Sequence, residues 1–489
     1  MPLPARLELG KETYLVYKTG IPFYDAARLI GVAHLFFGTA SAEVEDKGNY
    51  WEVSGVGIKR DEQQVLWIIN RLNPTKTERK LFQKDGVFLW KEFAEFFSER
   101  DVTNRKGSRE KLKAEYDVAL QIGTRGIDPL SKYEVLAPRS TGEILKQFKA
   151  PFQEVAVATL GRAFAASVRS FTKRQREEIY ILPVFRERFV ISGFLEYERS
   201  FVHASGGWVA AVWAALSILL DLTTKRLPVI DFAYTREAKA PTGQPIFSDS
   251  GYLGLGKLCI YWWNGVKEGK QETLNLLHNF REFLENTSSQ NTHEQVQALA
   301  RHVAAFIANP NAEALTKMEQ LKARILANSQ TQQVIGGTVA RRLLGRGEHL
   351  REVKAMLQLD LPEVPWQISE ALAKALGFDE GGWMNQFTRL ENTPNFSQFI
   401  QQVERIISRG CYREQQEKGQ QPNIREAMIR AHDLANTLRG IGSALQDEKA
   451  FRAWKAIFLL DVLSRARMRT EGSSEQTGEG EARELSEEG

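Results

Sequence analysis

Three segments of the sequence gather basic side chains of the kind that bind phosphate groups. The richest is the segment 100–113, which holds six basic and two acidic residues and cannot pack into an apolar core. Lys and Arg bind phosphate oxygens through charge-assisted hydrogen bonds. The candidate phosphate-binding residues in the three segments are Lys76, Arg79, Lys80, Arg105, Lys106, Arg109, Lys173, Arg174 and Arg176.

A fourth candidate segment runs from Tyr234 to Leu258 and is rich in Gly, Pro, Ser and Asp. This composition predicts an irregular loop, and a loop of such length is usually functional or disordered. The loop contains Arg236, Lys239 and Gln244. Arg can bond bidentately to guanine and Gln to adenine, whereas Lys mostly holds phosphate. The segment is therefore a candidate contact for a nucleic-acid duplex.

The residues from Gly251 to Lys257 fit the GxxxxGK spacing of a phosphate-binding loop. The next position should be a Ser or Thr that binds Mg²⁺, but it is Leu258 in this sequence. The Cys-Ile-Tyr-Trp-Trp run that follows is typical of a strand rather than of the helix that caps a bound phosphate. The glycines are therefore assigned to a turn, and nucleotide binding is disfavoured.

Other signatures of catalysis are missing from the sequence. Its seven histidines form no HExxH pair, no G-x-S-x-G stretch is present, and no two carboxylates have a spacing that suggests catalysis. Cys259 and Cys411 are too few for a disulfide framework or a thiolate metal site, which favours a reducing cytoplasm. We expect a cytoplasmic protein that is not an enzyme and has no cofactor or metal.

The elements that position these residues begin with a strand, a helix and a hairpin. Tyr14 and Val16 alternate as in a strand, and Pro22 opens a helix that should end at Gly38. A hairpin follows from Ala42 to Ile58. The helix is expected to bury one face, formed by Ala26, Leu29, Ile30, Ala33, Phe36 and Phe37.

The central part of the chain reads as a second mixture of helices and strands. A helix is predicted from Glu154 to Ser170, and strands are predicted at Ile179–Leu182 and Val229–Tyr234. The apolar run Trp208–Leu220 is shorter than the ~20 residues that cross a bilayer. It predicts a helix buried on all sides, and we expect no membrane span.

From Gly269 onward apolar residues recur at helical spacing as far as Arg469. One helix is expected from Ile424 to Leu438. Arg425, His432 and Arg439 recur at seven-residue spacing, so we expect them to share one exposed face. The next helix, Asp447 to Arg467, is expected to bury Phe451, Trp454, Ile457 and Phe458 and to display Arg452 and Lys455. Solvated helical faces explain these charges as well as a nucleic-acid groove does.

Together these patterns predict an α+β protein, in which an N-terminal and central mixed α/β region precedes an all-helical C-terminal bundle. The expected divisions are an N-terminal domain at 1–150, a central domain at 151–268, helices at 269–360, a small-subunit-like bundle at 361–470 and a disordered acidic tail at 471–489. The whole chain has 489 residues and a net charge of +4. The tail holds seven acidic residues and one Arg, so the remainder is more basic than this total indicates.

The block from Tyr17 to Gly38, YKTGIPFYDAARLIGVAHLFFG, and the order of the parts resemble the large subunit of the type I CRISPR Cascade complex, closest to subtype I-B. The resemblance implies a non-catalytic subunit that binds the guide RNA 5′ handle and the PAM duplex of target DNA and helps R-loop formation. The implied partners are the backbone, handle-binding and small subunits and a recruited helicase-nuclease or transposition adaptor. Base pairing would read the target sequence, which fits a basic chain without a catalytic constellation.

The resemblance does not fix the residues that read the PAM, because those loops vary within the family. From charge and loop character the candidates are Arg105, Lys106, Arg109, Arg236, Lys239 and Gln244. Two alternatives stay open. One is a helical scaffold whose basic faces meet acidic protein partners, and the other is an enzyme that uses the loop from Gly251 to Lys257.

Some members of that family also produce the small subunit from an internal start within the large-subunit gene. The break from Leu361 to Pro365 is a boundary signal, and Met356 and Met384 lie on either side of it. Either could begin a separate helical product, although for any single Met the role of filling a core is favoured.

Overall fold

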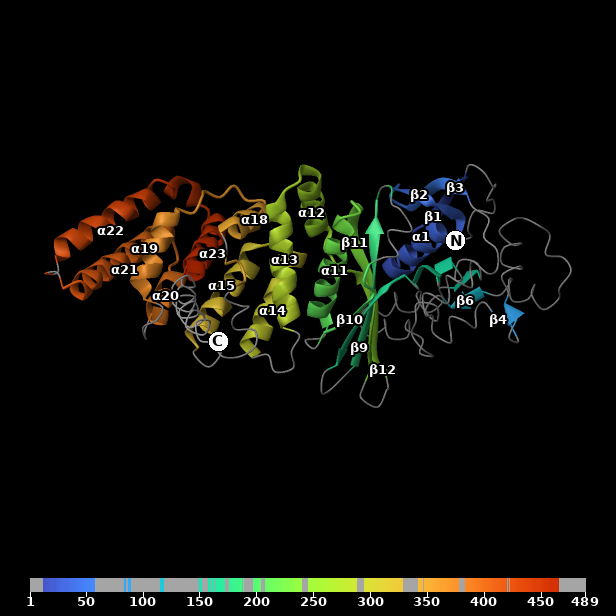
Figure 1. Cartoon of the computed structure of the whole chain (residues 1–489), viewed down its shortest axis with the longest axis horizontal. Helices are drawn as coiled ribbons and strands as arrows, with labels where there is room; N and C mark the ends of the chain where they lie inside the picture. Colours follow the sequence, from blue (N-terminus) through green and yellow to red (C-terminus); the bar gives the residue numbers. More distant parts are fainter. Residues whose placement is uncertain are drawn as a thin grey trace, which may run out of the picture. The chain divides into compact units, whose positions relative to one another are not determined.

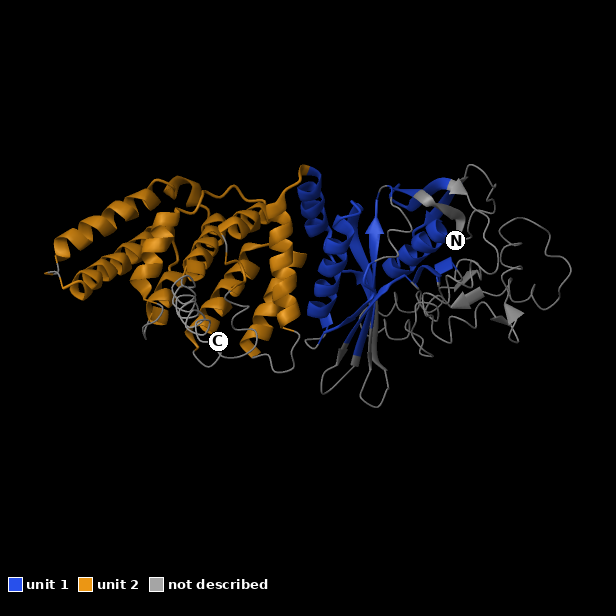
Figure 2. Cartoon of the chain, viewed as in Figure 1, with its two compact units in different colours: residues 1–267 blue, residues 268–489 orange. Residues whose placement is uncertain are grey.

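The computed structural model divides into two compact units, residues 1–267 and residues 268–489 (Figure 2). It describes residues 12–57, 83–84, 87–88, 115–117, 149–151, 157–158, 160–162, 164–171, 176–186, 188, 197–203, 207–239, 245–287, 294–328, 342–345, 347–377, 383–419, 421 and 423–465. A mixed α/β region precedes a helical region, which confirms the predicted fold class.

The N-terminal part of the first unit has the predicted strand, helix and hairpin. Strand β1 (Glu12–Tyr17), helix α1 (Pro22–Phe36) and strands β2 (Phe37–Asp46) and β3 (Tyr50–Gly57) form an antiparallel sheet with one helix. The strand order is β1-β3-β2. One detail differs from the prediction, because the helix ends at Phe36 and β2 begins at the next residue.

A buried pair of charged side chains fixes the start of α1. The Asp25 carboxylate accepts hydrogen bonds from the backbone N–H groups of Thr19 and Gly20, at 2.9 and 3.1 Å. Arg28 donates to the Tyr17 carbonyl at 2.7 Å and lies 3.5 Å from Asp25. Burial raises the pKa of Asp25, and its bonds to Thr19 and the charge of Arg28 lower it. These bonds tie the end of β1 to the first turn of α1.

The centre of the first unit is a five-stranded sheet in the order β10-β8-β9-β11-β12. Its pairs are antiparallel except β10–β8, which is parallel. The strands are β8 (Ala166–Phe171), β9 (Arg176–Phe185), β10 (Ser200–Val202), β11 (Val229–Lys239) and β12 (Pro245–Tyr252). The predicted helix Glu154–Ser170 is therefore wrong from Ala166 onward, where β-branched and aromatic residues pair with β9.

The predicted irregular loop from Tyr234 to Leu258 is also wrong. β11 and β12 form a hairpin there, and helix α12 (Gly256–Glu268) follows directly. Gly, Ser and Asp have weak strand propensity, but pairing along β11 overrides it because each added strand residue completes ladder hydrogen bonds.

Two helices cover this sheet (Figure 1). Helix α11 (Gly207–Thr223) packs against β8 and β9, and α1 packs against β9, β11 and β12 from the other side. Helix α1 also contacts its own three strands, so it is buried around its whole circumference rather than on one face. Its backbone comes so close to the segment 157–162 that a Cβ at Gly31 or Gly161 would collide with the facing carbonyl.

The described part of the second unit is a bundle of helices (Figure 1). Its described helices are α13 (Gln271–Asn286), α14 (Glu294–Ala308), α15 (Ala312–Ala327), α18 (Gly347–Leu357), α19 (Trp366–Leu376), α20 (Trp383–Glu391), α21 (Phe396–Glu417), α22 (Ile424–Arg439) and α23 (Glu448–Arg465). Helix α23 is central, because it packs against α15, α18 and α19.

This packing bears on the expected divisions. Helix α23 contacts α15 and α18, which precede the predicted boundary at residue 360, so the segments 269–360 and 361–470 lie in one compact unit. The tail at 471–489 lies outside the described residues. None of the helices in the described ranges combines the length and apolar character needed to cross a membrane.

Candidate nucleic-acid interface

The structure describes seven of the sixteen side-chain positions predicted to contact nucleic acid, some of them only by their backbone. Two of these, Arg176 and Lys239, are paired residues at one end of β9 and β11. The structure therefore places them side by side in the sheet, although they belong to different predicted segments. Nine others lie outside the described residues and stay predictions, namely Lys76, Arg79, Lys80, Arg105, Lys106, Arg109, Lys173, Arg174 and Gln244.

Arg236 lies on strand β11 and not in a loop, which corrects its predicted environment. Its Nη2 donates to Glu177 Oε1 of β9 at 2.5 Å. Glu177 is buried, and its other carboxylate oxygen accepts from the backbone N–H of Gly207 at the start of α11. Because Arg236 neutralises this buried carboxylate, it ties the sheet to α11, and it lacks the exposure that a guanine-reading Arg needs.

The GxxxxGK match has the strand, loop and helix order that the motif requires, since β12 ends at Tyr252 and α12 begins at Gly256. The predicted strand after Lys257 is therefore wrong. Apolar residues at Leu258, Cys259 and Trp262 follow helical spacing and are buried.

The amides of this loop are nevertheless occupied by the chain's own Asp231. Its Oδ1 accepts from Leu255 N at 3.0 Å and from Phe232 N at 2.7 Å, and Gly254 N–H also bonds to the carboxylate. Burial raises the pKa of Asp231, and these backbone bonds lower it. The carboxylate takes the place in which a motif of this kind would hold a phosphate, so the geometry disfavours nucleotide binding here.

Lys455 is buried in α23, and the prediction that it is displayed on the surface is wrong. Its Nζ donates to the carbonyls of Glu391 and Thr393 at 2.7 and 2.9 Å, where α20 ends. Burial lowers the pKa of Lys455, while the charges of Glu319 and Glu391 raise it. Lys455 is buried because α23 is central in the bundle. Neighbouring helices cover even the side of α23 that carries its polar residues.

Arg425, His432 and Arg439 are exposed on α22, as predicted. Two of them share one carboxylate of α21, since Glu404 lies 3.0 Å from His432 Nδ1 and 3.0 Å from Arg439 Nη2. Arg452 is exposed on α23 and pairs with Glu448 at 2.7 Å. Exposed pairs of this kind are weak, so these cations remain available to a phosphate that competes for them.

The sequence reasoning missed a row of arginines on α21. Arg405, Arg409 and Arg413 recur every fourth residue and therefore lie on one face of the helix. Arg405 and Arg409 are exposed and form no ion pair within the described part of the chain. The repeated four-residue spacing is the signal in the sequence that could have identified this row.

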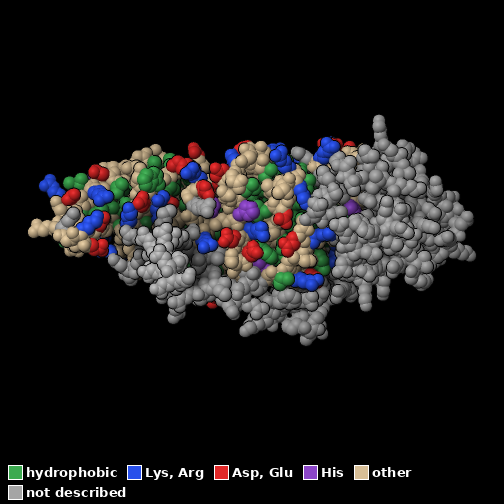
Figure 3. Space-filling model, viewed as in Figure 1, with side chains coloured by type: hydrophobic (Ala, Val, Ile, Leu, Met, Phe, Trp, Pro, Cys, Tyr) green, Lys and Arg blue, Asp and Glu red, His purple; other side chains and the backbone are tan. Residues whose placement is uncertain are grey.

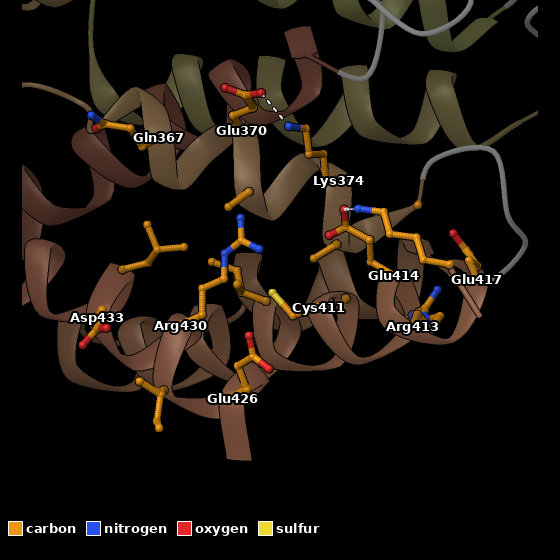
Figure 4. Close-up of a pocket in the computed structure, with 18 of the residues that line it drawn as sticks. Gln367, Glu370, Lys374, Cys411, Arg413, Glu414, Glu417, Glu426, Arg430 and Asp433 are labelled. Atoms are coloured by element: carbon orange, nitrogen blue, oxygen red, sulfur yellow. Dashed lines mark hydrogen bonds and ion pairs between the residues drawn. The ribbon is translucent and has the colours of Figure 1, made fainter. Parts of the chain in front are cut away.

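A groove of about 990 Å³ lies between α19, α21 and α22, and Arg413 of this row is among the residues that line it (Figure 4). Apolar residues such as Ile407, Cys411 and Leu434 line it, and ion pairs between Lys374 and Glu370 and between Lys418 and Glu414 stand along its rim. Its lining contains five acidic and four basic side chains. This balance does not favour a polyanion, in contrast to the row on α21.

Acidic and basic side chains also alternate over the visible face of the helical unit (Figure 3). Within the described ranges no group of three or more His, Cys, Asp or Glu residues could hold a metal ion. No protein-family model and no curated protein matches the sequence.

Proposed function

We propose that the chain binds nucleic acid as the non-catalytic large subunit of a CRISPR RNA-guided surveillance complex in antiviral defence. In this proposal it holds the guide RNA 5′ handle and the PAM duplex, helps R-loop formation and recruits a helicase-nuclease or a transposition adaptor. The observation that carries the nucleic-acid part is the row of Arg405 and Arg409 on α21. The assignment to a CRISPR complex rests on the resemblance of the block Tyr17–Gly38.

The row suits a phosphate backbone better than it suits a protein carboxylate. Two exposed guanidinium groups one helical turn apart, without ion pairs in the described ranges, can each release counterions from a bound strand. Arg425 on α22 is exposed in the same way. Such contacts hold a strand without reading its sequence, which matches a subunit that leaves sequence reading to base pairing.

The test is a salt series with the double variant Arg405→Gln and Arg409→Gln. Binding of labelled single-stranded RNA and duplex DNA should weaken, and the slope of log affinity against log salt should fall by about 2, because two phosphate contacts are lost. The matched control is Arg301→Gln with Arg324→Gln, two exposed arginines on α14 and α15. If the test variant and the control have equal slopes, the α21 row does not carry the binding.

The loop residues outside the described ranges need their own experiment. Replacing Arg105, Lys106 and Arg109 together by Ala should weaken target DNA binding by the assembled complex. Unchanged affinity and salt slope would remove this loop from the proposal.

The second candidate function is a helical scaffold for acidic protein partners. Exposed apolar residues on α22, namely Ile424, Met428 and Ile429, favour a protein partner. A protein that binds acidic polypeptides but neither RNA nor DNA at low salt would replace the first proposal with this one.

An internal start at Met356 or Met384 remains part of the proposal. A fragment that begins at either residue would lack α15, which packs against α23. The fragment would therefore leave part of an apolar helix uncovered unless a partner binds there. Intact-mass measurement of complexes from the wild type, Met356→Leu and Met384→Leu tests it, and a wild-type preparation without a C-terminal fragment would contradict it.

A further inference from the structure

A second cavity of the helical unit has a different lining from the groove. It has a volume of about 530 Å³ and lies between α18, the connection before α19, and α23. Volumes of this size are usual for small-molecule sites. The residues that matter for its chemistry are Arg351, Lys354, Glu363, Trp366, Trp454, Asp461 and Arg465.

The two tryptophans of the cavity differ in their accessibility. Trp366 is the first residue of α19, and its side chain is 57% exposed, so a flat ring could stack on it. Trp454 is fully buried, and its indole N–H has no acceptor among the described residues. Because none of the Trp454 side chain is accessible, its N–H lies out of reach of a ligand in the cavity, and Trp366 is the aromatic contact that the cavity offers.

The charges of the cavity leave one cation without a partner. Lys354 pairs with Glu363 at 3.1 Å, and Arg465 pairs with Asp461 at 3.1 Å. Arg351 is exposed and forms no ion pair within the residues that the structure describes. With three basic and two acidic side chains, the cavity favours a ligand with one negatively charged group.

We propose that this cavity binds a nucleoside phosphate unit. The base stacks on Trp366, and the phosphate binds Arg351. A free anion would use only the arginine, and an apolar ring would leave the arginine unused. The unit is either a free nucleotide or one unstacked nucleotide of a bound strand, and only the second source rests on the proposed function.

The decisive variants are Trp366→Ala and Arg351→Gln, because both side chains are exposed and neither change threatens the fold. AMP and GMP are titrated into the full chain by calorimetry, with adenosine and inorganic phosphate as partial ligands. Each variant should weaken nucleotide binding about tenfold or more, through loss of stacking or of a charge-assisted bond. Adenosine and phosphate should each bind more weakly than AMP.

Matched controls separate the site from general effects. Trp208→Ala removes another partly exposed tryptophan, which lies on α11, and Arg301→Gln removes another exposed arginine. Both controls should bind AMP as the wild type does. Trp366→Phe should recover much of the affinity, because a smaller ring still stacks, and a merely structural role for Trp366 would not predict this recovery.

The same variants tested with a labelled single-stranded oligonucleotide distinguish the two sources. Free-nucleotide binding that both variants weaken assigns the site to a small ligand, even if the chain binds no oligonucleotide and the proposed function fails. Oligonucleotide binding that both variants weaken relative to the controls assigns it to a strand. The proposal is overturned if neither variant changes the affinity for free nucleotide or for the oligonucleotide. It is also overturned if inorganic phosphate binds as tightly as AMP.

Discussion

Helices α22 and α23 follow one another in the chain, and both carry several basic residues, but their surroundings differ. Helix α22 buries four residues, three of them alanines, and exposes Ile424, Met428 and Ile429. Helix α23 buries thirteen residues, including Lys455 and Asp461. The difference arises because α23 is covered from several sides by α15, α18 and α19. The exposure of a basic residue therefore depends on the neighbours of its helix as much as on its own spacing.

The largest expected effect comes from a substitution on the apolar side of α23. Phe458 is fully buried, with ring centroids 5.2 Å from Trp454 and 5.6 Å from Phe399. Phe458→Ala should lower the free energy of unfolding by about 3–5 kcal/mol, because it removes buried surface and leaves a cavity. Met428→Ala on α22, where the side chain is 58% exposed, should change it by less than about 0.5 kcal/mol. Urea denaturation measures both, and equal values would contradict the comparison.

The next effect concerns the polar side of the same helix. Lys455→Met should cost about 2–3 kcal/mol, because the carbonyls of Glu391 and Thr393 lose a charged donor. Arg452→Met, three residues earlier, loses only an exposed pair with Glu448 and should cost about 0.5 kcal/mol or less. If the two variants unfold at the same urea concentration, Lys455 does not depend on its buried bonds.

A third effect is a pH dependence. Burial and the charge of Glu391 raise the pKa of Glu319 well above its ordinary 4.5, while Lys455 lowers it. The folded chain therefore holds this proton more tightly than the unfolded chain, so the stabilisation is present below pH 4.5 and is lost as the pH rises through the folded pKa.

The variant Glu319→Gln should lack this loss, which amounts to about 1.4 kcal/mol for each pH unit between the two pKa values. Urea denaturation of the wild type and the variant from acid to neutral pH gives the difference directly, because other groups titrate alike in both. A constant difference across the series would show that Glu319 does not titrate as proposed.

The smallest effect belongs to α22. Arg439→Gln removes an exposed contact with Glu404, so stability should fall by about 0.5 kcal/mol or less, and the loss should shrink further in high salt. Thermal unfolding at two salt concentrations measures it. A loss comparable to that of Lys455→Met would mean that α22 and α23 are not as different as their surroundings suggest.

The local parts of the fold could be predicted because each has a local cause. Gly48 adopts a φ of +83° in the hairpin turn, a conformation that glycine reaches without strain, and the sequence places it between two alternating runs. Helices α22 and α23 were predicted within a few residues from their apolar spacing. Non-local causes were not visible in the sequence. Nothing in the GxxxxGK spacing indicates that Asp231, on the neighbouring strand, occupies the loop amides.

The basic character of the candidate site was predictable from the sequence, but the exposure of its individual residues was not. A count of charges identified the last helices as basic, but it could not separate Lys455, which is buried, from Arg452, which is exposed. It also overlooked Arg405 and Arg409, because helix α21 as a whole carries as many acidic as basic residues. Only the arrangement of the side chains around the helix distinguishes a row of cations from a balanced surface.

The burial of α1 between two sheets also sets an order for synthesis and folding. Helix α1 ends at Phe36, but the five-stranded sheet that covers its second side includes β12, which ends only at Tyr252. At ~5–20 residues per second, about 10–40 s of translation separate the two. During this interval the nascent chain holds an apolar helix with one side uncovered, whereas α21 and α22 meet as soon as both emerge. The first unit therefore leaves an apolar helix partly uncovered for a longer stretch of synthesis than the α21–α22 pair does.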